Sequence, residues 1–100
     1  MTDPQEFKKT VKKWAEMVDI PVREIHLRPM KRKWGSCSSR GRLTFDAGIL
    51  GESEKKRAEI VLHELLHLKY PNHGKMFQVM LRTYLSSVID GGVARPQEQP

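Results

Sequence analysis

The segment best suited to chemistry is a short pattern of two histidines and one glutamate inside an apolar stretch. It reads His63-Glu64-Leu65-Leu66-His67. Residues four apart on a helix lie one turn above each other, so both imidazoles could bind one tetrahedral zinc ion at about 2.0–2.1 Å. With four His and eight Glu in the chain, chance would produce this H-E-x-x-H pattern in roughly one such sequence in a hundred.

Glu64 follows the first histidine directly, and a helix turns by about 100° per residue. Its carboxylate would therefore lie beside the open position of the metal and could take a proton from a bound water. Zinc lowers the pKa of such a water from its high value in bulk solvent toward about 7, which makes hydrolysis possible at neutral pH. The alternative is that the two histidines are structural, but burying these polar groups without a partner would be costly.

A third histidine, His73, follows His63 by ten residues and lies just past the Pro71-Asn72 break. The break can turn the chain back toward the metal, so we predict that His73 is the third ligand, in the first turn of the next helix. The spacing from His67 to His73 is the same as that between the last two histidines of the longer H-E-x-x-H-x-x-G-x-x-H pattern. In this chain, however, Tyr70 stands where that pattern has a glycine. The alternative is a surface residue at a helix start.

Cys37 is the single cysteine, so the chain has no internal disulfide. As a fourth ligand beside three histidines it would close the metal site and leave no position for a reactive water. Packing as a small apolar residue is the commoner fate of a lone cysteine. We therefore predict that Cys37 packs, and keep metal ligation as the alternative.

The first half of the chain predicts one helix and three short strands. Asp3, Pro4 and Glu6 have the types and spacing of a helix start, and an apolar stripe follows until Pro21 ends the helix: Phe7, Val11, Trp14 and Val18. Apolar and polar residues then alternate over residues 24–28, as in a half-buried strand. Strands at about 33–37 and 42–47 flank a polar turn and predict a hairpin.

The second half predicts two helices that carry the histidines. Ser53 can cap a mostly buried helix that runs to about Tyr70 and contains the H-E-x-x-H pattern. Asn72 can cap the last helix, whose core stripe begins at Phe77 and continues to Val88. After Asp90, two glycines and a Pro/Gln/Glu-rich end predict a disordered tail.

Size and composition limit the classes of protein. One hundred residues, 38% apolar and 30% charged, are typical of one globular domain. No apolar run approaches the roughly 18 residues of a membrane span, and the N-terminus lacks the pattern of a secretion signal, so we expect a cytoplasmic protein without membrane association. The charge of +6 comes from basic clusters that could bind nucleic acid, although solvated surface is the simpler explanation.

Two separated motifs in the chain resemble one known family. The segment Lys33-Trp34-Gly35-Ser36-Cys37-Ser38-Ser39 precedes the H-E-x-x-H helix, and Asn72-His73-Gly74-Lys75-Met76-Phe77 follows it. Together they are similar to the YgjP-like metallopeptidase domain, a relative of the SprT-like proteases within the zincins. The family usually has Arg at the position of Lys33, and Asn within the strand that here contains Thr44-Phe45-Asp46.

The resemblance covers about residues 30–80 and implies a zincin fold in which a short sheet lies against the active-site helix. It also implies a zinc peptidase with His63, His67 and His73 as ligands and Glu64 as general base. Together with the elements predicted above, we expect one small α+β zincin-like domain over residues 1–90, with residues 91–100 as the tail. The domain should contain an N-terminal helix, a short three-stranded sheet with a hairpin, an active-site helix and a C-terminal helix.

Peptidases of this build bind extended polypeptide beside the active-site helix, which makes Trp34, Gly35 and Ser36 the candidate substrate-binding residues. Two alternatives stay open. One is a zinc hydrolase of phosphoanhydrides or other non-peptide substrates. The other is a nucleic-acid-associated protease or binding module.

Overall fold

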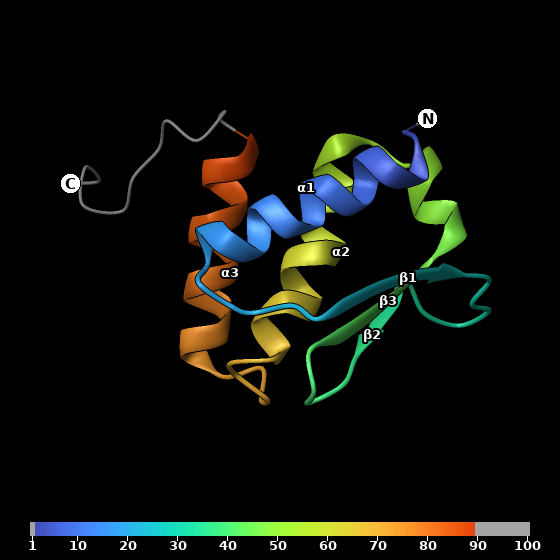
Figure 1. The fold of residues 1–100 in the computed structure, drawn as a ribbon. Coiled ribbons are helices and arrows are strands. Elements are labelled where there is room, and N and C mark those ends of the chain that lie inside the picture. Colours follow the sequence, from blue (N-terminus) through green and yellow to red (C-terminus); the bar gives the residue numbers. More distant parts are fainter. Residues whose placement is uncertain (1, 90–100) are drawn as a thin grey trace.

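The computed structural model describes residues 2–89, which fold into helices around a three-stranded sheet (Figure 1). The elements in chain order are α1 (Pro4–Met17), β1 (Glu24–Arg28), β2 (Gly35–Cys37), β3 (Arg42–Asp46), the short 3-10 helix η1 (Ala47–Gly51), α2 (Glu54–His67) and α3 (Lys75–Ile89). The predicted α+β class is confirmed. The predicted tail at residues 91–100 lies outside the described residues.

Side-chain caps begin two of the helices where the sequence predicts. The carboxylate of Asp3 accepts hydrogen bonds from the backbone N–H groups of Gln5 at 2.9 Å and Glu6 at 3.3 Å. The Ser53 hydroxyl accepts one from the N–H of Lys56 at 3.1 Å. Each cap satisfies donors that have no partner within the helix, so these starts are encoded locally.

The end of α1 differs from the prediction. The helix stops at Met17 rather than at Pro21. Asp19 has a φ of 59°, in the left-handed region, and this reversal directs the N–H of Ile20 to the carbonyl of Ala15 at 3.0 Å. A left-handed residue therefore ends α1 before the proline is reached.

The sheet is mixed, with the order β1-β3-β2. β1 pairs in parallel with β3, with Ile25 opposite Leu43, whereas β2 and β3 form the predicted antiparallel hairpin, with Gly35 opposite Phe45. β2 is consequently an edge strand. Its outer edge has backbone N–H and C=O groups that no neighbouring strand in the described part of the chain uses.

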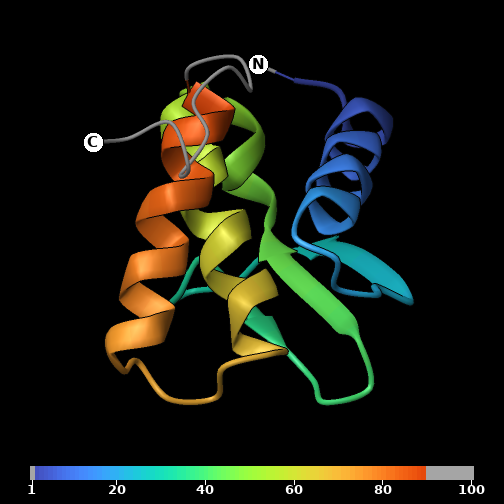
Figure 2. The same ribbon diagram turned by 90° about the vertical axis from the view of Figure 1, so that its left-hand side faces the viewer.

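One face of the sheet packs against the helices and forms the core. Leu43 and Phe45 of β3 are fully buried, and the Phe7 ring of α1 meets Phe45 edge-on at 5.5 Å. α2 and α3 lie side by side, and α1 packs against α2 (Figures 1 and 2). None of the helices within residues 2–89 is both long and apolar enough to cross a membrane.

The connection between α2 and α3 corrects two predictions. α2 ends at His67 instead of about Tyr70. The N–H groups of Leu68 and Lys69 bond to carbonyls three residues back, which tightens the last turn, and Tyr70 is disfavoured in a helix because it precedes Pro71. α3 begins at Lys75, so Asn72 does not cap it and His73 precedes the helix instead of lying in its first turn. This extended loop gives the His73 backbone the freedom to turn its side chain toward α2.

Candidate metal centre and active site

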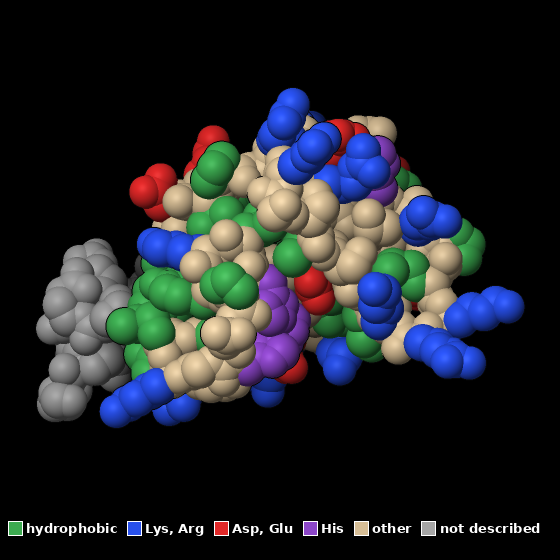
Figure 3. Space-filling model, turned by 90° about the horizontal axis from the view of Figure 1, so that it is seen from below, with side chains coloured by type: hydrophobic (Ala, Val, Ile, Leu, Met, Phe, Trp, Pro, Cys, Tyr) green, Lys and Arg blue, Asp and Glu red, His purple; other side chains and the backbone are tan. Residues whose placement is uncertain are grey.

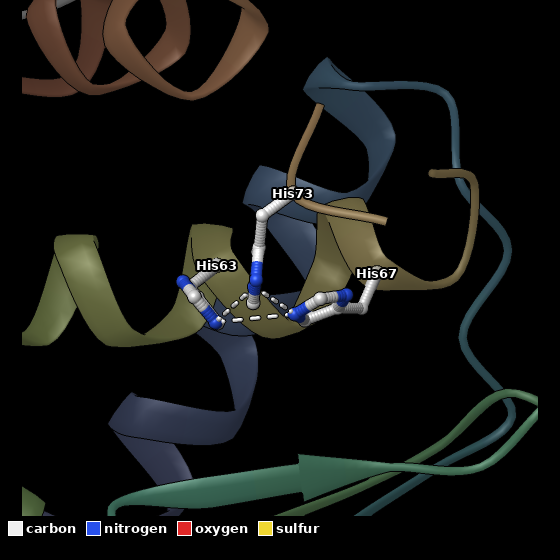
Figure 4. Close-up of side chains that lie close together, drawn as sticks. All are labelled: His63, His67 and His73. Carbon is white, nitrogen blue, oxygen red and sulfur yellow. Dashed lines mark hydrogen bonds between the residues drawn. The ribbon is translucent and has the colours of Figure 1, made fainter. Parts of the chain in front are cut away.

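Three histidine side chains converge at the end of α2. His63 and His67 lie one turn apart on that helix, with their Nε2 atoms 3.2 Å from each other (Figure 4). His73 reaches in from the loop, and its Nε2 atom lies 3.3 Å from that of His63 and 2.7 Å from that of His67. All three rings therefore present the same nitrogen to one point.

This convergence fits a bound cation. None of the three imidazoles forms an ion pair with a carboxylate in residues 2–89. Three nitrogens that face each other cannot all be satisfied by hydrogen bonds among themselves, because a neutral imidazole has one N–H donor and one acceptor. Among the His, Cys, Asp and Glu residues of the described chain, these three histidines form the group that could hold a metal ion.

The surroundings keep His63 in the form that binds metal. Burial lowers the pKa of His63 below its usual value, and the nearby charges of His67 and His73 lower it further. A metal ligand must be a neutral imidazole, so the environment of His63 favours the state that coordination requires.

The ring of Phe77 packs against all three imidazoles. It is only 1% exposed, and its ring centroid lies 5.3, 4.9 and 4.8 Å from those of His63, His67 and His73. The sequence marks Phe77 as the first core residue of the last helix and as part of the second family motif, but not as a neighbour of the histidines. Its contact with every candidate ligand depends on the packing of α3 against α2, which no local spacing reveals.

Glu64 lies against β2. A β-carbon built on Gly35 would lie 3.2 Å from Cγ of Glu64, so the glutamate side chain uses the space that this glycine leaves open. Burial raises the pKa of Glu64, while the charges of Lys33 and His73 and a hydrogen bond with Cys37 act in the opposite direction. Such a raised pKa is typical of a carboxylate that exchanges protons.

Cys37 lies beside Glu64 and not among the three histidines. Its half-buried side chain packs against the core, and its thiol contacts the Glu64 carboxyl. Burial and the charge of Glu64 both raise the pKa of the thiol. The group of histidines that could hold a metal ion does not include Cys37, which agrees with the predicted packing role.

Comparison with known proteins identifies the family. The model of the YgjP-like metallopeptidase domain matches residues 4–89. The chain belongs to this family. It is therefore a metallopeptidase domain, and the resemblance carried by the two sequence motifs is confirmed. No curated protein sequence matches the chain.

Two crystal structures of archaeal metallopeptidase zymogens share the fold of this YgjP-like domain. Methanocaldococcus jannaschii jannalysin aligns with a TM-score of 0.72 and 26% identity over 94% of this chain and 100% of its own. Pyrococcus abyssi abylysin aligns with a TM-score of 0.68 and 20% identity over 91% and 95%. The zincin-like fold expected for the family is thus confirmed.

A pocket of about 290 Å³ opens beside His63 and Glu64 of the YgjP-like domain. Of the three candidate substrate-binding residues, Trp34 and Gly35 line this pocket. Ser36 does not, and it lines a different groove with Thr44, its neighbour across the hairpin. The structure therefore brings two of the three together with His63 and Glu64.

Three further residues of the pocket were not singled out from the sequence: Lys56, Glu59 and Ile60. They lie on α2 at seven, four and three residues before His63. Helical periodicity places such positions on the face of His63 and could have found them. Lys33 also lines the pocket; the sequence marks it as part of the first family motif, but not as a pocket residue.

Proposed function

We propose that this YgjP-like metallopeptidase is zinc-dependent, with His63, His67 and His73 as ligands and Glu64 as general base. The observation that supports zinc best is the spacing of the three Nε2 atoms. Ligands at 2.0–2.1 Å in a tetrahedron lie about 3.3 Å apart. Two of the three separations are 3.2 and 3.3 Å, and the third is 2.7 Å.

The donor set and surroundings also favour a catalytic over a structural site. Structural zinc sites use four protein ligands, whereas catalytic sites use three and keep one position open. When bound, zinc lowers the pKa of a coordinated water toward about 7 and polarises a carbonyl oxygen. Cys37, the one thiol in the chain, is engaged with Glu64 and leaves that position free.

Glu64 has the position and the proton affinity of a general base. Its carboxylate lies between the histidines and β2, and its raised pKa favours taking a proton from the attacking water. The protonated carboxyl can then donate that proton to the leaving amine. The neighbouring Cys37 thiol and the wall formed by Gly35 restrict where the carboxyl can point.

The free edge of β2 is the proposed binding site for extended polypeptide. An incoming chain can pair with the unused N–H and C=O groups of this edge, next to α2. Trp34 and Gly35 would then lie under the substrate, beside the pocket at His63. We assign Ser36 a backbone role, since its side chain faces the other side of the sheet.

The substitution Glu64→Gln tests this mechanism. It keeps the size of the side chain but removes the base, so polypeptide hydrolysis should fall by roughly 10² to 10⁴ or more while zinc stays bound. Glu16→Gln removes an exposed carboxylate of α1 and serves as control. Zinc content is measured by metal analysis and hydrolysis with unstructured polypeptides and with nucleoside triphosphates.

Two outcomes would contradict the proposal. One is peptide cleavage that continues unchanged in Glu64→Gln. The other is hydrolysis of triphosphates alone, abolished by the substitution, which would replace the peptidase with a phosphoanhydride hydrolase.

A further inference from the structure

The loop between β1 and β2 displays consecutive cations on a fixed backbone. Lys31, Arg32 and Lys33 are all exposed. Asp46 holds the loop at both ends: its carboxylate accepts the N–H of Met30 at 2.7 Å, and its own N–H donates to the carbonyl of Trp34 at 2.8 Å. The three charges between these two anchors are therefore presented in a defined place.

Arg28 joins these three cations along one groove. The groove, of about 390 Å³, is lined by Arg28, Lys31, Arg32 and Lys33 together with Pro29, Met30, Ser36 and Thr44, and no acidic residue lines it. Asp46 lines a neighbouring pocket with Lys31, Arg32 and Lys33. None of the four forms an ion pair in residues 2–89. Arg42 on the same sheet, by contrast, pairs with Glu24 at 3.5 Å. The groove thus has positive charge available for an anionic ligand.

Lys33 connects this groove with the catalytic pocket. It lines both, and its charge acts on Glu64. In the catalytic pocket Lys56 adds a second cation, while Trp34 and Ile60 provide apolar wall. Figure 3 shows several Lys and Arg side chains on the surface around the histidine cluster. A side chain with methylene groups and a terminal carboxylate would match this combination of walls and charges.

We propose that the YgjP-like domain selects polypeptide segments rich in acidic residues, with a Glu side chain in the Lys33–Lys56 pocket. Further acidic residues on the same side of the scissile bond would lie along the groove of Lys31 and Arg32. This inference rests on the proposed peptidase function and names its substrate class. Charge-assisted hydrogen bonds from lysine to carboxylate supply the selectivity.

The composition of the pocket favours an acidic polypeptide over a nucleic acid. Glu59 and Glu64 also line the pocket and offset the charges of Lys33 and Lys56, so a single carboxylate must contact the two lysines directly, and a continuous phosphate backbone finds no excess of positive charge there. Among the residues that line the two pockets, Trp34 is the one aromatic side chain, so the surface offers no series of rings for stacking bases. A polypeptide can place single carboxylates at the lysines and pair its backbone with β2.

The test uses the zinc-loaded full chain and one cleaved peptide resynthesised with Glu, Gln, Leu or Lys at each position around the scissile bond. At the position that enters the pocket, Glu should exceed Gln in kcat/KM by on the order of tenfold, since one charge-assisted hydrogen bond in a partly desolvated pocket has about that effect. Raising the salt concentration should reduce the difference, because the charges are partly exposed.

Charge-reversed variants identify the responsible residues. The double variant Lys33→Glu/Lys56→Glu should lose the preference for Glu and cleave the Lys peptide best, whereas Lys33→Arg should retain it. Lys31→Glu/Arg32→Glu should weaken only the effect of acidic residues farther from the bond. Lys9→Glu/Lys12→Glu, a double reversal at exposed positions of α1, changes the net charge equally and should leave the preference intact.

The outcomes separate this inference from the proposed function. If the zinc-loaded wild type cleaves no peptide, the peptidase function itself is wrong and the inference falls with it. If peptides are cleaved without a preference for Glu, or the preference survives the Lys33→Glu/Lys56→Glu variant, only the inference is overturned. Binding of duplex DNA that Lys31→Glu/Arg32→Glu abolishes, without any Glu preference, would replace the acidic polypeptide by nucleic acid.

Discussion

Gly35 of β2 and Glu64 of α2 lie in direct contact, and a β-carbon on the glycine would be 3.2 Å from Cγ of the glutamate. The same β-carbon would be 3.0 Å from the Phe45 ring and 3.2 Å from the carbonyl of Thr44. Phe45 is fully buried and the carbonyl is backbone, so Glu64 is the partner that can move. The absence of a side chain at position 35 therefore leaves room for the Glu64 side chain beside β2.

We predict that Gly35→Ala lowers both stability and activity while zinc remains bound. Overpacking of this kind costs roughly 1–3 kcal/mol, and displacement of Glu64 should reduce kcat. Denaturant titration and peptide hydrolysis measure the two effects. Gly51→Ala is the matched control, because a β-carbon there would meet nothing within 4 Å. Equal effects of the two substitutions would argue against the contact.

The Cys37 thiol should be slow to react with alkylating agents. Its raised pKa means that less thiolate is present at a given pH than for an ordinary cysteine, so the alkylation rate of the metal-free protein should rise only at higher pH. Glu64→Gln removes the neighbouring negative charge and should shift that pH profile downward. A profile that is the same in both proteins would show that the two groups do not interact. Cys37→Ser should keep its zinc.

Glu64 should destabilise the metal-free protein at neutral pH. Its folded-state pKa is raised above the unfolded value, so its favourable contribution is complete below about pH 4.5 and is lost as the pH rises through the folded pKa. Gln cannot ionise. Thermal unfolding with a chelator present should therefore show Glu64→Gln to be more stable than wild type at pH 7, with the difference disappearing in acid. A constant difference at all pH values would contradict this.

Replacement of Phe77 should weaken metal binding as well as folding. Phe77→Leu removes the ring that contacts all three histidines, and loss of such support typically lowers metal affinity by roughly 10- to 100-fold. Phe7→Leu is a matched control, since Phe7 is equally buried but packs on Phe45. It should lose stability and retain zinc affinity, as measured by competition with a chelating dye. A similar loss in both variants would assign Phe77 a purely structural role.

Zinc affinity should be nearly constant above about pH 7 and fall in acid below about pH 6.5, because protons compete for the imidazoles. The lowered pKa of His63 has a second consequence for the metal-free protein. Its contribution to stability is present above about pH 6.5 and is lost as the pH falls through the folded pKa. Zinc titrations and unfolding curves at a series of pH values test both statements. Zinc binding that strengthens in acid would contradict the histidine site.

The sequence by itself determined the features that depend on neighbours along the chain. The four-residue interval between His63 and His67 places both on one face of any helix, and the structure shows their nitrogens together. Asp3 and Ser53 start their helices by capping N–H groups two or three residues ahead. The strand at residues 24–28 follows from alternation, and it is found with those bounds. These features rest on short-range geometry, which sequence spacing specifies directly.

Tertiary packing decided the relationships between distant residues. Whether Cys37 lies near the histidines or near Glu64 depends on how β2 packs beside α2. The parallel pairing of β1 with β3 sets the sheet order that leaves β2 at the edge. The backbone around His73 was predicted as helix and is a loop, although its side chain reaches the other two histidines. The position of Lys33 in the pocket also depends on this packing. Contacts between elements depend on which apolar faces bury each other, and those faces meet only when the whole chain folds.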